Sequence, residues 1–163
     1  MATDRLWAPW RLDYIQSVKD ETACVFCRIR DSKKDADNLV LLRGKYNYVV
    51  LNRYPYCSGH LMVVSNDHTG ELKSLSTEAH HEILSLMGDS MEILKESIGA
   101  QGFNCGVNMG RVAGAGILDH FHFHVVPRWA GDNNFMPVLA DTKTMPEYLE
   151  KTYAKLAGGF QKL

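Results

Sequence analysis

Three histidines at two-residue spacing are the part of this sequence that most directly indicates chemistry. His120, His122 and His124 alternate with phenylalanines in the segment 119–128. In an extended strand, alternate side chains share one face, and same-face neighbours lie about 6.5–7 Å apart. The strand therefore predicts three imidazoles in a row, with the phenylalanines and a valine packed on the opposite face. Imidazoles are neutral, nucleophilic and metal-binding near pH 7, so the row indicates chemistry on a rigid element; a polar strand face or a crowded metal site is the alternative.

The cysteines suggest a second site. Cys24 and Cys27 are separated by two residues, a spacing that suits one tetrahedral zinc ion. A redox pair is the alternative, but it would need the motif to open a helix directly after a strand. Cys57 and Cys105 stand alone in the sequence, and we expect both to be small buried hydrophobic residues.

Length and composition limit the possible functions. The 163 residues suit a single domain, and 18 Lys+Arg against 19 Asp+Glu give a formal charge of −1. Without a concentrated basic surface, nucleic acid is not expected as a partner. The first residues do not form a signal-peptide core, and no stretch of about 18 apolar residues exists, so we expect no membrane association and a cytoplasmic location.

Periodicity and turn residues predict an α+β domain built on an antiparallel sheet with one long and one short helix. The long helix covers 77–98, with Ser76 or Thr77 as its N-cap and Gly99 at its end. The short helix is expected at 145–157, and residues 1–22 form an irregular aromatic arm. Strands are expected at 38–42, 46–51, 60–65, 103–109 and through the histidine segment.

The long helix also carries an apolar stripe. Ile83, Met87, Met91 and Leu94 recur at helical spacing and offer more apolar surface than a small sheet needs. Together with an edge strand, which favours pairing, this stripe predicts a homodimer.

The histidine segment, followed by Val-Val-Pro-Arg, resembles the signature of the histidine triad (HIT) family of nucleotide hydrolases and transferases. The segments 50–55 and 59–60, and the order of Asn108, the glycine-rich loop and His120, are similar to that family as well. Residues 64–76 resemble a zinc-ligand segment of the related galactose-1-phosphate uridylyltransferases. Residues 24–137 are covered in all, and the segments 6–15 and 127–137 look like the bacterial diadenosine tetraphosphate phosphorylases.

The resemblance implies a single HIT-like domain over 1–163, with a C-terminal extension at 129–163. It implies a nucleotidyl transferase or hydrolase that cleaves the phosphoanhydride of dinucleoside polyphosphates. His122 would attack the α-phosphate and form a nucleotidyl-histidine intermediate, which inorganic phosphate or water then resolves. His124 would contact phosphate, and His60 would support the cluster from the neighbouring strand.

The resemblance also implies a nucleotide-binding set. Asn52 would bind a ribose hydroxyl, and Asn108 a phosphate or bridging oxygen. Backbone N–H groups of the loop at Gly114 and Gly116 would cradle an anion. The base slot would be lined by Val25, Phe26, Ile29 and Leu51. Many family members carry Gln followed by Ser or Thr where this chain has Gly116 and Ile117, so side-chain donation to phosphate is missing there.

In zinc-bearing relatives the first histidine of the triad is a metal ligand, whereas in relatives without zinc it belongs to the catalytic cluster. Because Cys24, Cys27 and His68 stand in the matching places, the resemblance implies one structural zinc per chain, with His120 as the fourth ligand. Other functions remain open: a nucleoside phosphoramidase, an asymmetric dinucleoside polyphosphate hydrolase, or a non-catalytic zinc-stabilised nucleotide-binding module.

Overall fold

The computed structural model describes residues 23–132, 145 and 147–163. The expected aromatic arm at 1–22 lies outside the described residues. So do residues 133–144, which hold part of the expected C-terminal extension. Within the described part of the chain, no helix is both long and apolar enough to cross a membrane.

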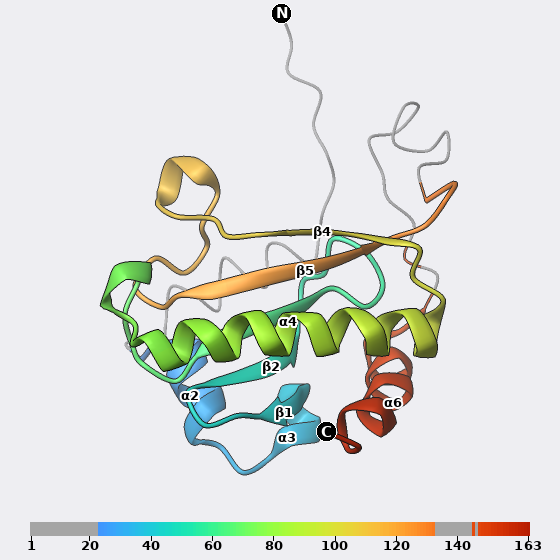
Figure 1. Cartoon of the computed structure of the whole chain (residues 1–163), viewed down its shortest axis with the longest axis horizontal. Helices are drawn as coiled ribbons and strands as arrows, with labels where there is room; N and C mark the ends of the chain where they lie inside the picture. Colours follow the sequence, from blue (N-terminus) through green and yellow to red (C-terminus); the bar gives the residue numbers. More distant parts are fainter. Residues whose placement is uncertain (1–22, 133–144, 146) are drawn as a thin grey trace, which may run out of the picture.

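The fold is built on one five-stranded antiparallel sheet with the order β1-β2-β3-β5-β4 (Figure 1). Its strands are β1 Val40–Arg43, β2 Asn47–Leu51, β3 Leu61–Ser65, β4 Gly102–Gly106 and β5 His122–Arg128. The last strand therefore lies inside the sheet, between β3 and β4, with ladder partners on both sides. This position gives the histidine strand a rigid backbone. The antiparallel sheet, together with the helices that pack on it, confirms the predicted α+β class.

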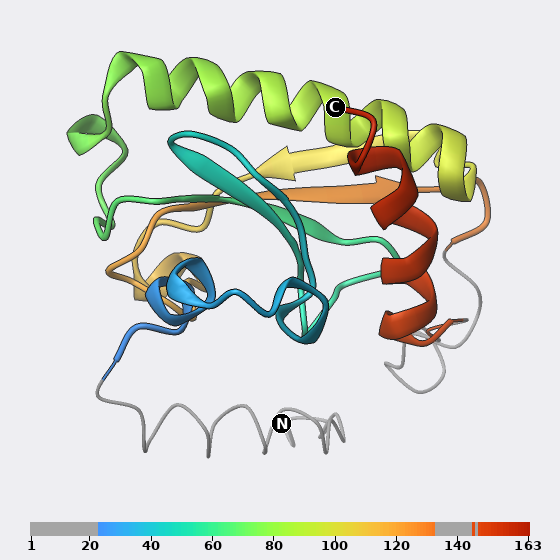
Figure 2. The same cartoon turned by 90° about the horizontal axis from the view of Figure 1, so that it is seen from below.

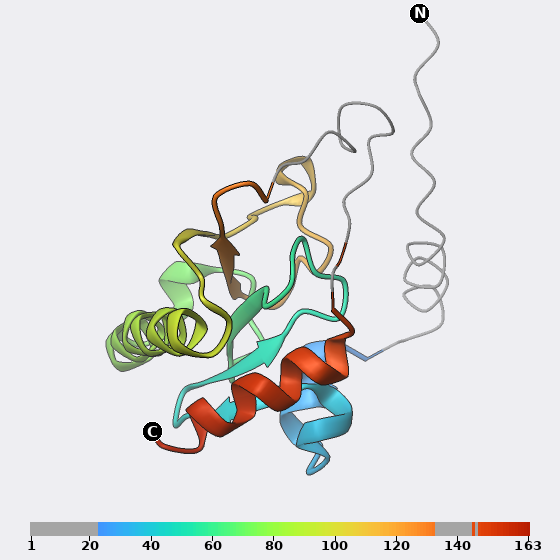
Figure 3. The same cartoon turned by 90° about the vertical axis from the view of Figure 1, so that its right-hand side faces the viewer.

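Helix α4, Thr77–Ile98, has the predicted bounds and caps. The Ser76 hydroxyl accepts a hydrogen bond from the backbone N–H of Ala79, and Gly99 ends the helix in the left-handed conformation at φ 65°. The helix lies across one face of the sheet, whereas α2, Val25–Asp31, and α3, Asp35–Asn38, lie on the other side (Figures 2 and 3).

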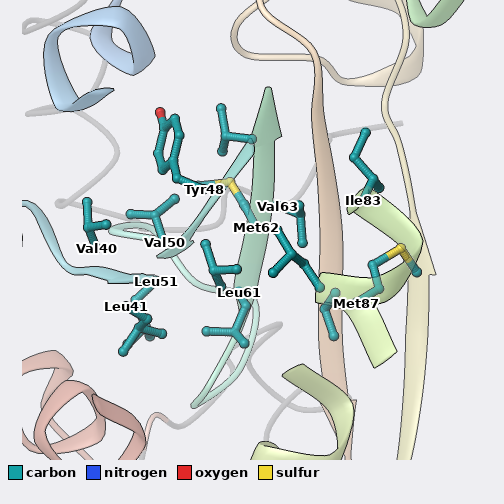
Figure 4. Packing of buried hydrophobic residues seen from close by; sticks show 14 of the residues in the cluster. Val40, Leu41, Tyr48, Val50, Leu51, Leu61, Met62, Val63, Ile83 and Met87 are labelled. Carbon is teal, nitrogen blue, oxygen red and sulfur yellow. The ribbon is translucent and has the colours of Figure 1, made fainter. Parts of the chain in front are cut away.

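The main hydrophobic core fills the space between α4 and the sheet. Ile83 and Met87 of α4 approach Val63 of β3, and Leu61 and Val63 have no exposed surface (Figure 4). Most of the expected apolar stripe is therefore buried in the chain's own core: Ile83 is 4%, Met87 8% and Leu94 0% exposed, whereas Met91 is half-buried. Its use as a spare dimerisation face was wrong, because the sheet already covers it.

Three helical features were not predicted correctly. Helices α2 and α3 are too short to give a periodic signal. Helix α6, Leu149–Phe160, contacts α4 and β1 and continues past the expected end at residue 157. A glycine pair follows that residue, yet burial of Phe160 to 1% exposure extends the helix. Gly159 is needed there, since a Cβ would lie 2.6 Å from Ile93.

Two smaller differences concern β4 and its cysteine. The strand ends at Gly106, three residues before the predicted end. Cys57 is buried, as expected, and its thiol donates to the carbonyl of Pro127. Cys105 is exposed, so its expected burial was wrong; β4 is the outer strand of the sheet.

Candidate functional site

The triad is divided between a strand and the turn before it. Strand β5 begins at His122, so His120 lies outside the regular strand and the predicted row of three is interrupted. His122 pairs with Val64 and His124 pairs with Met62, which fixes both rings on the face turned away from α4. Their ring centroids are 5.0 Å apart. This pair forms the core of the candidate active site.

The hydrogen bonding of His122 determines which nitrogen can react. Its Nδ1 lies 2.9 Å from the backbone carbonyl oxygen of His120. Because a carbonyl oxygen only accepts, Nδ1 carries the proton and donates it to that bond. The neutral ring therefore keeps its lone pair on Nε2. This is the tautomer that a nucleophilic imidazole requires.

His124 is held in the opposite tautomer. The backbone N–H of Tyr56 donates to Nδ1 of His60 at 3.1 Å, so the proton of neutral His60 sits on Nε2. That Nε2 donates to Nδ1 of His124 at 2.9 Å. The proton of His124 consequently lies on its Nε2, which is buried and has no hydrogen-bond partner among the described residues. An orphaned buried donor of this kind suits an oxygen of a bound ligand.

Burial keeps these rings neutral. Desolvation, with a smaller contribution from the neighbouring imidazoles, lowers the pKa of His60 to about 3 and the pKa of His124 to about 4. The pKa of His122 is also lowered by burial, although its bond to the His120 carbonyl opposes the shift. Neutral rings do not compete with each other for protons near pH 7, so the two tautomers persist.

Cys24, Cys27, His68 and His120 form a compact cluster whose ligand atoms all lie within 4.8 Å of one another. The thiol sulfur of Cys24 is 3.3 Å from Nδ1 of His120, and that of Cys27 is 3.3 Å from Nδ1 of His68. The two Nδ1 atoms are 3.4 Å apart. Zinc bonds of about 2.3 Å to sulfur and about 2.0–2.1 Å to nitrogen, at tetrahedral angles, separate ligands by about 3.3–3.8 Å. The cluster therefore fits a tetrahedral metal ion.

A backbone hydrogen bond holds His120 in the tautomer that can bind a metal ion. Its Nε2 donates to the carbonyl oxygen of Ser65 at 2.7 Å, which leaves the lone pair on the Nδ1 that faces the cysteines. Helix α2 begins directly after Cys24, so its first turn carries Cys27 to the same point. The motif does open a helix, as a redox pair would. However, its thiols face two histidines, which favours the metal interpretation.

Two pockets lie near these clusters, one beside His124 and the other beside His68 of the metal cluster. One, of about 580 Å³, is lined by His124, Asn108 and Tyr56 together with residues of β4 and β5. The other, of about 430 Å³, lies beside Val25 and Gly116. His124 and Asn108 are therefore brought together as the resemblance implies.

The other residues expected to bind the nucleotide differ in their burial and in their partners. Asn52 is half-buried; its Oδ1 accepts from the backbone of Tyr54 and its Nδ2 lies 3.4 Å from Nδ1 of His60. Phe26 is 3% exposed and packs on the rings of His120 and His122. Ile29 is half-buried against the core.

One expected base-slot residue, Leu51, needs correction, and one expected anion-binding glycine already has a hydrogen-bond partner. Leu51 pairs with Leu61, and Leu61 pairs with Val125, so these three side chains share one face of the sheet. Val125 is next to His124 on β5 and points to the other face. The side chain of Leu51, 1% exposed, therefore lies on the face opposite the histidines. It belongs to the core because strand register decides its direction. Gly114 already donates its N–H to the carbonyl of Arg111. Gly116, the other expected anion-binding glycine, lines the pocket of about 430 Å³.

Sequence reasoning missed Tyr56. Its ring centroid lies 4.6 Å from His60 and 5.9 Å from His124, and it lines the larger pocket. No signal marked it, because its contacts come from the folding of a loop and not from any spacing.

Comparison with known proteins agrees with this geometry. The family model described as HIT domain matches residues 33–131. The sequence is 37% identical over 161 residues to the AP-4-A phosphorylase of Mycobacterium tuberculosis (strain CDC 1551 / Oshkosh), covering 94% of this chain and 82% of that protein. The chain belongs to the HIT family.

Other relatives carry different activities. Over 106 residues the chain is 30% identical to the adenosine 5′-monophosphoramidase hnt1 of Schizosaccharomyces pombe, covering 65% of this chain and 74% of that protein. A crystal structure of a zinc-bound HIT protein from Mycobacterium smegmatis superposes with a TM-score of 0.69 at 26% identity. That match covers 86% of this chain and 94% of the other. The HIT fold is thus shown, whereas the choice of substrate needs further argument.

The lowered pKa of His60 predicts a pH-dependent stability. The unfolded chain binds a proton at His60 below about pH 6.5, while the folded chain does not until about pH 3. The free energy of unfolding therefore falls as pH drops through this window. In His60→Gln this contribution is absent. Between pH 7 and pH 5 the free energy of unfolding should therefore fall by about 2 kcal/mol less in the variant than in the wild type. Urea unfolding at both pH values measures the difference.

His81→Gln, on the exposed side of α4, is the matched control and should keep the wild-type pH dependence. Equal pH dependence of His60→Gln and wild type would contradict the neutral state of His60.

Proposed function

We propose that this HIT protein is a dinucleoside polyphosphate phosphorylase that acts through a nucleotidyl-His122 intermediate. The observation that carries the proposal is the opposite tautomers of two adjacent histidines. One presents a lone pair on Nε2, and the other presents an N–H on Nε2. A nucleophile beside a donor for phosphate oxygen is what attack on an α-phosphate needs. The 37% identity to an AP-4-A phosphorylase supports this substrate class.

In the first step, Nε2 of His122 attacks the α-phosphorus of diadenosine tetraphosphate. A P–N bond forms, the P–O bond to the bridging oxygen breaks, and ATP leaves with the electron pair of that bond. The neutral imidazole carries no charge that would oppose its approach to the anionic phosphate. The N–H of His124 donates to a phosphate oxygen, and the neutral amide of Asn108 lies in the same pocket.

In the second step, an oxygen of inorganic phosphate attacks the same phosphorus. The P–N bond breaks, ADP is released, and the lone pair returns to Nε2 of His122. The proton stays on Nδ1 of His122 and is donated to the His120 carbonyl oxygen throughout, so the ring needs no proton from solvent. Covalent transfer in two steps predicts ping-pong kinetics.

Replacement of His122 by Asn tests the nucleophile. The change keeps a polar side chain of similar reach but removes the attacking nitrogen, so turnover should fall at least about a thousandfold while nucleotide binding persists. Product analysis with diadenosine tetraphosphate, with and without phosphate, provides the measurement; the wild type should release ADP and ATP only with phosphate. His81→Asn, exposed on α4, should retain activity.

Several outcomes would contradict the assigned nucleophile or assign a different activity. Near-normal turnover by the Asn variant would remove His122 as the nucleophile. Formation of AMP and ATP from water would indicate an asymmetric hydrolase, and turnover restricted to adenosine phosphoramidate would indicate a phosphoramidase. Nucleotide binding without any product would indicate a binding module.

The metal cluster is proposed to hold one structural zinc. Four protein ligands close the coordination shell, so the ion would supply rigidity to the turn before β5 and no open position for water. The zinc-bound HIT structure from Mycobacterium smegmatis supports this choice of metal.

Cys24→Ser tests the zinc proposal. Loss of one thiolate weakens metal binding that is coupled to folding, so the melting temperature should fall by at least about 5 °C, and zinc should fall well below one per chain. Calorimetry and metal analysis measure both. Cys105→Ser, at an exposed cysteine, should change neither. A chelated, metal-free protein with unchanged melting and full activity would rule the site out.

The homodimer remains a proposal, now limited to a sheet edge. Strand β4 is the outer strand next to β5, and on its other side no described strand pairs with it. An open edge of this kind favours pairing with a second copy. Light scattering at micromolar concentration should give twice the chain mass of 18.4 kDa, and Cys105→Lys, which adds a charge to the edge, should shift the mass towards the monomer. A wild-type mass of one chain would refute the dimer.

A further inference from the structure

The strand face that carries His124 continues beyond the triad as a groove between β4 and β5. Along β5, His124, Val126 and Arg128 alternate onto this face, and all three line the pocket of about 580 Å³. His122 belongs to the same row but does not line the pocket. The groove therefore starts at His124 and runs along the strand away from the nucleophile.

Glycine keeps this groove open. Gly106 of β4 pairs directly with His124. Its φ is not positive, and a Cβ at this position would meet nothing within 4 Å. Neither backbone conformation nor packing requires glycine there, although glycine weakens a strand. The consequence of the missing side chain is open space beside the triad.

The far end of the groove presents hydrogen-bond donors. Arg128 donates from Nε and Nη2 to the carboxylate of Asp132 at 2.6 and 3.0 Å, and from Nη1 to Oδ1 of Asn104 at 2.9 Å. Because guanidinium only donates, it turns the Asn104 oxygen inward and leaves the Nδ2 amide as a donor. These bonds use three of the five N–H groups of Arg128. Asn104 is exposed on β4 opposite Val126, in the middle of the groove.

The geometry of in-line phosphoryl transfer indicates where the leaving group would lie relative to this groove. The attacking and leaving atoms must lie on opposite sides of the phosphorus. With His122 on one side, a leaving group passes His124 and continues towards Arg128. We infer that the β4–β5 groove is the subsite for the departing nucleoside polyphosphate, with the Asn104 amide as a donor to it and Arg128 as its positioning residue. This inference rests on the proposed function.

The groove should therefore distinguish ligands by what extends beyond the α-phosphate. AMP has no leaving group and does not reach Asn104, whereas diadenosine tetraphosphate does. Asn104→Asp keeps the oxygen that accepts from Arg128 but replaces the amide donor with a negative charge, which repels a polyphosphate. Gln101→Glu is the matched control: it makes the same change in charge just before β4, outside the groove. Its remaining Oε1 can still accept from the backbone of Ala130.

Binding is measured by calorimetry in the His122→Asn background, so that no ligand is consumed. Asn104→Asp should raise the Kd for diadenosine tetraphosphate roughly tenfold or more, and change the Kd for AMP by less than about twofold. Gln101→Glu should leave both constants within about twofold of the background.

The outcomes separate this inference from the proposed function. An unchanged Kd for the tetraphosphate in Asn104→Asp, or equal weakening of AMP, overturns the groove as a leaving-group subsite. Failure of the background protein to bind the tetraphosphate overturns both ideas. The expected binding pattern without turnover in the protein that retains His122 supports the groove and contradicts the proposed function alone.

Discussion

The direction of a few hydrogen bonds controls the chemistry available in this site. A backbone carbonyl only accepts and a backbone N–H only donates, so each fixes the proton of a buried imidazole beside it. The carbonyl of His120 leaves a lone pair on Nε2 of His122, while the N–H of Tyr56, acting through His60, leaves a proton on Nε2 of His124. Two residues of the same type, on one strand face, thereby acquire opposite roles.

The same turn of chain also couples the metal cluster to the active site. The ring of His120 faces Cys24, just before α2, and Cys27 in its first turn, and the His120 carbonyl accepts from His122. Phe26, on the same helix, packs against both rings. A metal ion bound at the cluster would therefore stabilise the backbone position on which the His122 tautomer depends, without contacting the substrate. By this route, metal binding at the proposed site would support activity without a part in bond breaking.

Relatives named as a phosphorylase and as a phosphoramidase are both similar to this chain, so similarity alone does not select the substrate, and the surfaces around the triad become the features to compare. In the glycine-rich loop, Gly116 and Ile117 have no side-chain hydrogen-bond donor. Donors are instead found on the other side of His124, where Asn104 and Arg128 line an open groove. Under the inference drawn above, these donors contact a ligand that extends along the sheet.

The sequence by itself determined the long helix and the approximate positions of the strands along the chain, because these follow from local periodicity and capping. Helix α4 has the predicted bounds for this reason. The Cys24–Cys27 pair and the histidine row follow from motif spacing, whereas His60 and His68 were assigned from the resemblance to the HIT family. The order of the strands in the sheet came only from the tertiary structure. Tertiary structure alone decided the side-chain directions and protonation states. Strand register turns Leu51 away from the histidines, burial of Phe160 extends α6 through a glycine pair, and a turn before β5 sends His120 to the metal cluster. Each of these depends on contacts between residues far apart in the chain, which no local pattern records.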